Sequence, residues 1–383
     1  MNAHAPKYLF PWRAGNRFEL LADGSVFFPR MLEAIERARE TVSLEMYLVE
    51  SGAVMERFAG ALARAARRGV EVRLLFDDYG ARGLAEADRR RLREAGVVLA
   101  FYNPLRGAKL LGNFFRDHRK LLLVDREVAF VGGAGLTDEF DPPPDRAPAW
   151  RETMVEIRGP VLADWHALFR EVWERHGRAP LAATAEVPAA AGTQRGRVTS
   201  TRRLLRQEIK GSLIARLRAA RERAWIASAY FLPPWRLRRA LRSAARRGVD
   251  VRLLLPGPRT DHPAVRHASR HLYRPLLANG VRIFEYQPRF LHHKVVLCDD
   301  WVSIGSANFD RWNLRWNLEA NQEIADAAFA RATQAMFERD FRDSAEIRLQ
   351  TWERRPWHAR LAEFAWSVVA MWLERLGRGR GLH

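Results

Sequence analysis

The sequence predicts an α/β protein made of two similar domains, each a mixed sheet flanked by helices. One observation is a long repeat: residues 61–76 read ALARAARRGVEVRLLF, and residues 240–255 read ALRSAARRGVDVRLLL. A second is the octet HRKLLLVD at 118–125, which recurs as HHKVVLCD at 292–299. With 383 residues, 48% of them hydrophobic, the chain is long enough to pack two cores.

The repeated segments predict the same order of elements in both halves. A strand-like run, at 41–50 and again at 223–234, precedes an arginine-rich amphipathic helix, a glycine suited to a left-handed helix end, and a buried strand. A further helix end, glycine and strand follow at 94–104 and 278–288. The octets come next, so each half is a strand–helix–strand–helix–strand series.

The domain boundaries follow from this repeat. We expect a first domain at residues 1–177 and a second at 201–350, each carrying one octet. Residues 178–200 are rich in Ala, Pro, Gly and Thr without periodicity, which is typical of a linker. The last segment, 351–383, is apolar in its middle and ends in arginines, which predicts an amphipathic tail that lies on a membrane.

The formal net charge of +19 points to a polyanionic partner, either nucleic acid or an anionic lipid surface, and does not distinguish the two. The single cysteine, Cys298, excludes an intramolecular disulfide, so a reducing compartment is expected. The first residues lack the layout of a signal peptide. The longest apolar stretch, 364–373, covers only ~15 Å as a helix, so we expect no transmembrane span.

The octets place a histidine and a lysine on one face of a strand, since residues two apart point the same way. Two of only five lysines in the chain, Lys120 and Lys294, occupy this position after His118 and His292. Two histidines suit opposite tasks, one attacking and the other moving a proton. Two ammonium groups suit a phosphodiester, whose oxygens gain charge as a bond to phosphorus breaks. The pattern therefore favours phosphodiester chemistry.

Other polar residues are candidates for the same site. Ser306 and Asn308, in GSAN, could donate hydrogen bonds to phosphate oxygens. Glu152 and Glu319 follow the octets at similar places in the two halves, and a carboxylate there could hold the far ring nitrogen of a histidine. A surface ion pair is the alternative for either glutamate. We take these four residues as substrate-binding candidates.

Asp125 and Asp299 end the octets, where a turn-forming role is as compatible with the sequence as a polar role in the site. A metal site is the competing interpretation, since His and Asp can bind zinc. We do not expect one, because an ammonium group repels a cation and no carboxylate or cysteine cluster has ligand spacing. No cofactor is indicated.

The pattern HxKxxxxD, present twice and followed by GSxN, resembles the phospholipase D superfamily. Segments such as LEMYLVESG, AYFLPP and NLEANQEI are similar to the bacterial cardiolipin synthases of that superfamily, and the likeness covers roughly residues 15–345. It implies two phospholipase D-like domains in a pseudo-two-fold arrangement, with both octets at one site. It also implies a phosphatidyl-histidine intermediate, with His118 as nucleophile and His292 as proton carrier. The implied catalytic set is His118, Lys120, Asp125, His292, Lys294 and Asp299.

Two departures from the family pattern concern the site. The first half reads GGAG, with Gly135 where an asparagine belongs, so a backbone N–H could substitute for the amide there. In the second half the turn from Asp299 to Gly305 is one residue shorter than the turn from Asp125 to Gly132. Either Asp299 or Asp300 could then take the Asp role, and we choose Asp299 because its spacing from Lys294 matches.

Apolar residues near the site favour lipid over nucleic acid, and no DNA-binding motif is recognised. The segment before His118 offers Leu110, Leu111, Phe114 and Phe115 to a lipid interface, unless it is a helical cap packed on the core. The tail offers Trp366 and Trp372, unless it docks on the protein itself.

The resemblance and these residues together predict a peripheral enzyme at the cytoplasmic face of the bacterial inner membrane. It would make cardiolipin from two phosphatidylglycerol molecules, with anionic phospholipid and the membrane surface as partners and without nucleic acid. A phospholipase D-type lipid hydrolase or nuclease, and a catalytically silent lipid-binding scaffold, are the alternatives. The sequence does not indicate an oligomeric state.

Overall fold

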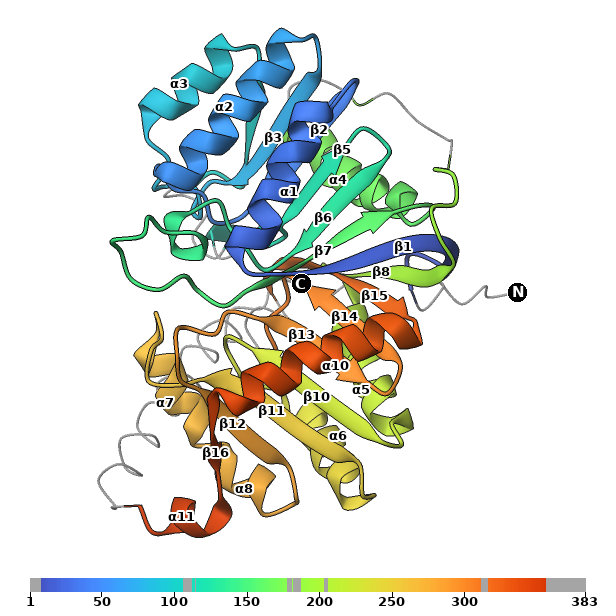
Figure 1. The fold of residues 1–383 in the computed structure, drawn as a ribbon, viewed down its shortest axis with the longest axis vertical. Helices are drawn as coiled ribbons and strands as arrows, with labels where there is room; N and C mark the ends of the chain where they lie inside the picture. Colours follow the sequence, from blue (N-terminus) through green and yellow to red (C-terminus); the bar gives the residue numbers. More distant parts are fainter. Residues whose placement is uncertain are drawn as a thin grey trace.

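The structure is a computed structural model that describes residues 8–105, 112–113, 115–177, 181, 187–202, 206–310 and 316–355. The two halves of the chain stack along the long axis of the molecule, the first half (blue to green) above the second (yellow to red) in Figure 1. The described residues form one continuous sheet of sixteen strands, with helices on both of its faces (Figure 1). This confirms the predicted α/β class.

The first half contains strands β1 to β7, helices α1 to α4 and the short 3-10 helix η2. The strands and helices are β1 (Arg13–Ala22), α1 (Gly24–Arg37), β2 (Thr41–Met46), α2 (Ala53–Arg67), β3 (Glu71–Asp77), α3 (Glu86–Glu94), β4 (Val98–Tyr102), β5 (Leu121–Val124), β6 (Val128–Gly132), η2 (Asp138–Phe140), β7 (Thr153–Arg158) and α4 (Leu162–His176).

The second half follows the same order, with strand β9 and one further helix inserted and with a strand and a short helix added at its end. Its elements are β8 (Gln194–Arg202), β9 (Arg206–Gln207), α5 (Glu208–Ala219), β10 (Arg223–Ser228), α6 (Trp235–Arg246), β11 (Asp250–Pro256), α7 (Pro263–Arg270), α8 (Tyr273–Leu277), β12 (Arg282–Tyr286), β13 (Lys294–Cys298), β14 (Trp301–Gly305), β15 (Leu318–Ala325), α10 (Ala327–Arg342), β16 (Ser344–Ile347) and α11 (Leu349–Glu353).

The strand order displays the pseudo-two-fold relation directly. From the centre outwards the first half runs β1-β7-β6-β5-β2-β3-β4, and the second runs β8-β15-β14-β13-β10-β11-β12 before the added edge strand β16. Parallel strands β2, β3 and β4 in one half match β10, β11 and β12 in the other. The repeated sequences therefore build equivalent mixed sheets.

The repeated helix–glycine–strand segments fold as the sequence predicts. In both copies the helix, α2 or α6, is followed by a glycine with positive φ, Gly69 at 93° or Gly248 at 89°. A glycine adopts this left-handed conformation without steric cost, so the chain turns at once into β3 or β11. The second pair of predicted strands is also confirmed, as β4 and β12.

The two sheets join through β1 and β8, which pair antiparallel with an irregular register at Arg13 and Asn16. This corrects the predicted linker, because residues 194–200 belong to β8, which pairs with β15 over eight residues, from Leu318 to Ala325. The sequence did not indicate this strand, because most of its buried residues are small or polar (Gly196, Thr199, Ser200 and Thr201) and show no apolar alternation. The remaining domain boundaries stay a prediction.

Three large clusters of buried apolar side chains form the core of the described residues, beside a small contact of Ile209 with Ala307. One lies under α1 and α2 in the first half and another under α5 and α6 in the second. The third runs through both halves beneath α4 and α10, and includes Trp165, Val198 and Phe337. A core that crosses the junction fixes the two halves against each other, which is what a site built from both requires.

Candidate active site

The two octets meet at the junction between the halves. The backbone N–H of His118 donates to the carbonyl of Leu318 over 3.0 Å, and that of His292 donates to the carbonyl of Arg151 over 2.8 Å. His118 is thus tied to the first residue of β15, and His292 to the segment just before β7, each in the opposite half. The buried strands β5 and β13 then carry the rest of each octet into the core.

Each histidine is held by a carboxylate from the opposite half. Nδ1 of His118 lies 3.0 Å from Oε1 of Glu319, and Nδ1 of His292 lies 2.6 Å from Oε2 of Glu152. Both glutamates are fully buried. The sequence predicted carboxylates that hold the far ring nitrogens, and the structure adds that the pairing is crossed, which the sequence order did not indicate.

Electrostatic effects show that the two octets share one centre. Burial lowers the pKa of Lys120 to about 7, Glu319 raises it, and the charge of Lys294 lowers it further. Burial likewise lowers the pKa of His118, and Lys120 and Lys294 act in the same direction. Since Lys294 acts on both His118 and Lys120, the charged groups of the two octets lie within electrostatic reach of one another.

The same forces set the protonation of the histidines. Burial lowers the pKa of His292 to about 4, and Lys294 adds to this. Burial alone would raise the pKa of Glu152, but Lys294 and the hydrogen bond from His292 lower it to about 2. An ionised carboxylate only accepts hydrogen bonds, so the proton of neutral His292 sits on Nδ1, and Nε2 carries the lone pair.

The two octets differ in the contacts of their lysines. Lys294 bonds to the carbonyl of His292, lies 3.3 Å from Glu152 and has its Nζ 3.1 Å from Nε2 of His292. Lys120 bonds to the carbonyl of His118 over 2.7 Å and lies 5.1 Å from the centre of the Tyr47 ring. Among the described residues, a lysine nitrogen thus contacts the ring of His292 and none lies within hydrogen-bond distance of the ring of His118.

Ser306 and Asn308 play different parts. The Ser306 hydroxyl donates to Glu319 and accepts from the backbone N–H of Ala320, so it positions the Glu319 carboxylate. The sequence predicts Ser306 as a donor to the substrate, but its hydroxyl hydrogen is already used in this bond. Asn308 is fully buried, and neither its amide nitrogen nor its oxygen has a hydrogen-bond partner in the part of the chain that the structure describes. An unpaired buried amide is costly, so Asn308 remains a substrate-binding candidate.

The first half lacks both side chains for steric reasons. A Cβ placed on Gly133, the counterpart of Ser306, would lie 2.1 Å from Oε2 of Glu152, and a Cβ on Gly135 would lie 2.6 Å from the Leu48 carbonyl. The carboxylate of Glu152 occupies the space that a serine would need. The first half is thus built for glycine at both positions, which explains the departure from GSxN.

Asp125 and Asp299 do not join the histidines, which corrects their place in the predicted catalytic set. The Asp125 carboxylate accepts from the backbone N–H groups of Arg39, Glu40 and Thr41, and that of Asp299 accepts from Arg221, Glu222 and Arg223. Both aspartates have positive φ, 50° and 48°. They fix the turn that precedes β2 or β10. The identical contacts confirm Asp299, not Asp300, as the match to Asp125.

We therefore expect Asp125→Ala to destabilise the fold without removing the chemistry. Three backbone N–H groups lose a charged acceptor, which costs about 2–3 kcal/mol. Urea unfolding should show this loss, while the folded variant should still form any covalent intermediate. Loss of the intermediate in a variant of wild-type stability would restore Asp125 to the catalytic set.

Aromatic side chains around the histidines were not identified from the sequence. The ring centres of Phe140, Trp150 and Phe290 lie 5.4, 5.4 and 5.7 Å from that of His292. The Tyr47 ring lies 4.6 Å from His118. Tyr47 directly follows β2, which pairs with the octet strand β5. Its place at the end of that predicted strand could have indicated that it lies near His118. These rings limit access of water to the histidines.

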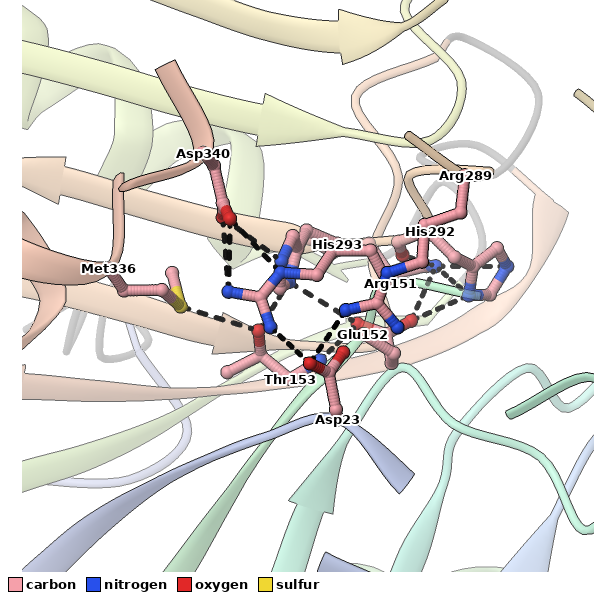
Figure 2. A network of polar contacts seen from close by, with 10 residues as sticks. Asp23, Arg151, Glu152, Thr153, Arg289, His292, His293, Met336 and Asp340 are labelled. Atoms are coloured by element: carbon pink, nitrogen blue, oxygen red, sulfur yellow. Dashed lines mark hydrogen bonds and ion pairs between the residues drawn. The ribbon is translucent and has the colours of Figure 1, made fainter. Parts of the chain in front are cut away.

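A polar network behind Glu152 also links the halves (Figure 2). Arg151 donates to Asp23 over 2.7 Å and to Asp340 on α10 over 3.0 Å, and Arg289 shares Asp23 at 2.7 Å. His293 lies beside Asp340 and bonds to Thr153, the residue after Glu152. The network holds the Glu152 segment rigidly against the second octet.

Most of the predicted membrane residues lie outside the described part of the chain, namely Leu110, Leu111, Phe114, Trp366 and Trp372. Phe115 is described: it is half-buried, and its ring centre lies 5.5 Å from that of Trp316. Among the described residues, no helix has the length and apolar character needed to cross a bilayer. The membrane contacts of these residues stay a prediction.

A family model described as "Cardiolipin synthase, PLD-like domain" matches residues 31–173 and 213–341, which include both octets and both crossed glutamates. The chain belongs to this phospholipase D-like cardiolipin synthase family. Cardiolipin synthase A of Pseudomonas aeruginosa is 38% identical over 344 residues, covering 88% of this chain and 69% of that protein. Cardiolipin synthase B of Salmonella typhi is 37% identical over 334 residues, covering 83% and 78%.

Solved structures extend the likeness of this phospholipase D-like protein at the level of fold. The phosphatidylserine synthase of Haemophilus influenzae superposes with a TM-score of 0.70 at 12% identity, over 95% of this chain and 96% of that one. A polyphosphate kinase of Porphyromonas gingivalis superposes with a TM-score of 0.61 at 16% identity, over 95% of this chain and 54% of that one. The family model and the curated relatives confirm the resemblance to the phospholipase D superfamily, and these structures add the likeness of fold.

The protonation of the site predicts a pH dependence of stability. His292 has a pKa of about 4 in the folded chain against 6.5 for the free side chain. Between these values the unfolded chain binds a proton that the folded chain does not. The free energy of unfolding should therefore rise as the pH is raised from 4 to 6.5. Urea titrations across this range would measure it. His292→Gln should reduce the slope without abolishing it, because burial also lowers the pKa of His118 and of His166. An unchanged slope would contradict the assignment.

Proposed function

We propose that this protein is a cardiolipin synthase, which transfers a phosphatidyl group from one phosphatidylglycerol to another and releases glycerol. One observation carries the proposal: a single buried centre holds two histidines, two lysines and two crossed carboxylates. This is a complete set for attacking, protonating and neutralising one phosphodiester. The names of the curated relatives supply the lipid substrate.

In the first step, Nε2 of His118 attacks the phosphorus of one phosphatidylglycerol. The bond from phosphorus to Nε2 forms, the bond to the terminal glycerol oxygen breaks, and His292 gives that oxygen a proton. In the second step, His292 takes the proton from a hydroxyl of a second phosphatidylglycerol. That oxygen attacks phosphorus, the bond to Nε2 breaks, and His118 is restored.

The contacts of the two histidines support this division of roles. His292 has the shorter bond to its carboxylate, 2.6 Å, and among the described residues no serine bonds to Glu152, so Glu152 can stabilise the imidazolium of a proton carrier. Glu319 also accepts a hydrogen bond from Ser306 and lies 3.0 Å from His118, and no lysine nitrogen of the described residues lies within hydrogen-bond distance of the His118 ring. In the substrate-free site His292 is neutral, and the negative phosphodiester would raise its pKa on binding.

The lysines and the aromatic rings support transfer to an alcohol over transfer to water. Burial lowers the pKa of Lys120 to about 7 and also lowers that of Lys294. An anion bound beside the two lysines would stabilise their protonated forms and raise both pKa values. The rings of Phe140, Trp150 and Phe290 surround the proton carrier with apolar surface. A dry site favours a positioned lipid hydroxyl as acceptor.

We further infer that the enzyme acts as a peripheral protein at the cytoplasmic face of the bacterial inner membrane. The net charge of +19 is supporting evidence, because anionic phospholipids attract a basic surface. The predicted amphipathic tail at 351–383 is the second support.

The test is to incubate the full-length chain with phosphatidylglycerol vesicles in EDTA and to analyse the lipids and the water-soluble products. Cardiolipin and glycerol in equal amounts are the expected result, and His118→Ala is the matched blank. Phosphatidic acid with glycerol would identify a hydrolase and overturn the synthase proposal. DNA cleavage without lipid turnover would identify a nuclease, and turnover of neither would leave a silent scaffold.

A further inference from the structure

A cavity of about 250 Å³ lies at the junction of the halves, between α4 and the first octet on one side and β8, β9 and β15 on the other. Its inner wall is Leu168 and Val172 of α4, Tyr102 of β4 and the Leu318–Glu319 segment of β15. Arg119 also lines it, between the two octet residues that face the histidine centre, and donates to the Leu168 carbonyl. Because neighbouring residues of an extended chain point to opposite sides, the cavity lies on the other side of the octet from His118 and Lys120.

The equivalent space beside the second octet is filled. The registers of β1 with β7 and of β8 with β15 make Thr201 the counterpart of Asp23 and Leu318 the counterpart of Arg151. The stacked pairs Phe169–Trp173 and Phe337–Phe341 align α4 with α10, which makes Val172 the counterpart of Asp340. In the second half, Arg151 lies between Asp23 and Asp340 and occupies this space (Figure 2).

Beside the first octet, Leu318, Val172 and Thr201 stand in place of this ion triad, and no side chain of the described residues fills the volume they leave. The Thr201 hydroxyl is 2% exposed and has no hydrogen-bond partner in the described part of the chain. A buried hydroxyl without a partner is costly, so this position calls for an acceptor. The cavity has room for roughly eight water molecules at ~30 Å³ each, or for a small polar ligand.

The rim of the cavity is cationic. Arg175 and Arg202 share one carboxylate, that of Glu171. Arg206 lies 3.5 Å from Glu208, whose two oxygens already accept from the backbone N–H groups of Leu9 and Ser200. Each guanidinium has five N–H donors, so the three arginines keep donors for a ligand. Arginine forks match phosphate oxygens well.

We propose that this cavity binds a phosphate group carried on a small organic backbone, such as glycerol phosphate, at a site separate from the two-histidine centre. The arginines would hold the phosphate oxygens and the Thr201 hydroxyl would donate to the ligand. The apolar wall of Leu168, Val172 and Leu318 would contact its carbon atoms. The phosphate ester would come either from an anionic lipid headgroup or from a soluble metabolite.

The site is coupled to the reaction through its wall. Leu318 accepts the backbone hydrogen bond of His118, and Glu319 holds the ring of the same histidine. A ligand against this segment would change how firmly His118 is positioned, while His292 would be unaffected. Occupancy would therefore alter kcat more than KM for the donor lipid.

The binding test is calorimetric titration of the full chain with glycerol 3-phosphate, and separately with inorganic phosphate. Arg202→Gln with Arg206→Gln should weaken binding by about tenfold or more. Arg90→Gln with Arg91→Gln, two exposed arginines of α3, removes the same charge and should have no effect. Thr201→Val, which keeps the side-chain shape, should weaken binding by a smaller factor.

Lys120→Met decides between the two sites. Binding that survives in Lys120→Met and is lost in the arginine variant supports the cavity. Binding lost in Lys120→Met and kept in the arginine variant would place the ligand at the histidines and overturn the proposal, as would no binding at all. In Lys120→Met, displacement by phosphatidylglycerol vesicles but not by phosphatidylcholine vesicles would identify a lipid headgroup, and displacement by neither a soluble ester.

Discussion

Replacing His118 by alanine is expected to abolish the covalent enzyme intermediate and to lower the transfer rate by roughly 10⁴-fold or more. Nε2 of His118 supplies the only bond between protein and phosphorus in the proposed route. Without it, water or an alcohol must attack directly in a site that is arranged around the missing ring. The fold should be retained, because the backbone bond from residue 118 to Leu318 does not depend on the side chain.

The measurement is mass spectrometry of the enzyme quenched during turnover of phosphatidylglycerol. The wild type should carry a phosphatidyl group on His118. In His292→Ala both the departing glycerol and the acceptor hydroxyl lose their proton carrier, so the adduct should form more slowly and, once formed, should persist on His118 because acceptor attack is slowed. His271→Ala, at the exposed end of α7, is the control. An adduct on His292 in the His118→Ala variant would reverse the two roles.

Glu152→Gln is expected to have the second largest effect, on activity and stability together. This carboxylate holds His292 at 2.6 Å and lies 3.3 Å from the buried ammonium of Lys294. An amide of the same shape leaves that ammonium without its counter-charge, which costs about 3 kcal/mol or more. It also removes the group that orients His292 and stabilises its protonated form, so the acid limb of the rate–pH profile should move.

Glu319→Gln is the matched comparison, because Glu319 contacts His118 and Ser306 and has no lysine within ion-pair distance among the described residues. We expect it to lower the rate but to cost less stability than Glu152→Gln in urea unfolding. Equal losses of stability in the two variants would show that the Lys294–Glu152 contact is not the stronger one. An unchanged pH profile in Glu152→Gln would remove Glu152 as the positioning residue for His292.

Local sequence patterns predicted the repeated elements well. The segments around Gly69 and Gly248 combine helical periodicity, a left-handed helix end and a buried strand, and each of these signals depends on neighbours in the chain. The octets likewise predicted that His118 and Lys120 share one face of a strand, as do His292 and Lys294, because alternation along a strand depends only on neighbouring residues. Strand β8 was missed, since its Thr, Ser and Gly residues carry no apolar alternation.

The roles of the aspartates also needed the structure. A turn former and a site residue look the same in sequence, and only the three backbone N–H groups at Asp125 and at Asp299 decide between them. Ser306 is a similar case. It was expected to face the substrate, but its hydroxyl is taken by Glu319.

By itself the sequence determined the α/β class, the duplication, the four histidine and lysine residues of the centre and the family. Each of these follows from the composition or the residue spacing of segments a few tens of residues long. Only the tertiary structure decided that Glu319 serves His118 and Glu152 serves His292, because that crossing depends on how two halves far apart in the chain dock. The same is true of the cavity beside Glu319, since a volume left empty by Leu318, Val172 and Thr201 exists only once three distant segments are brought together.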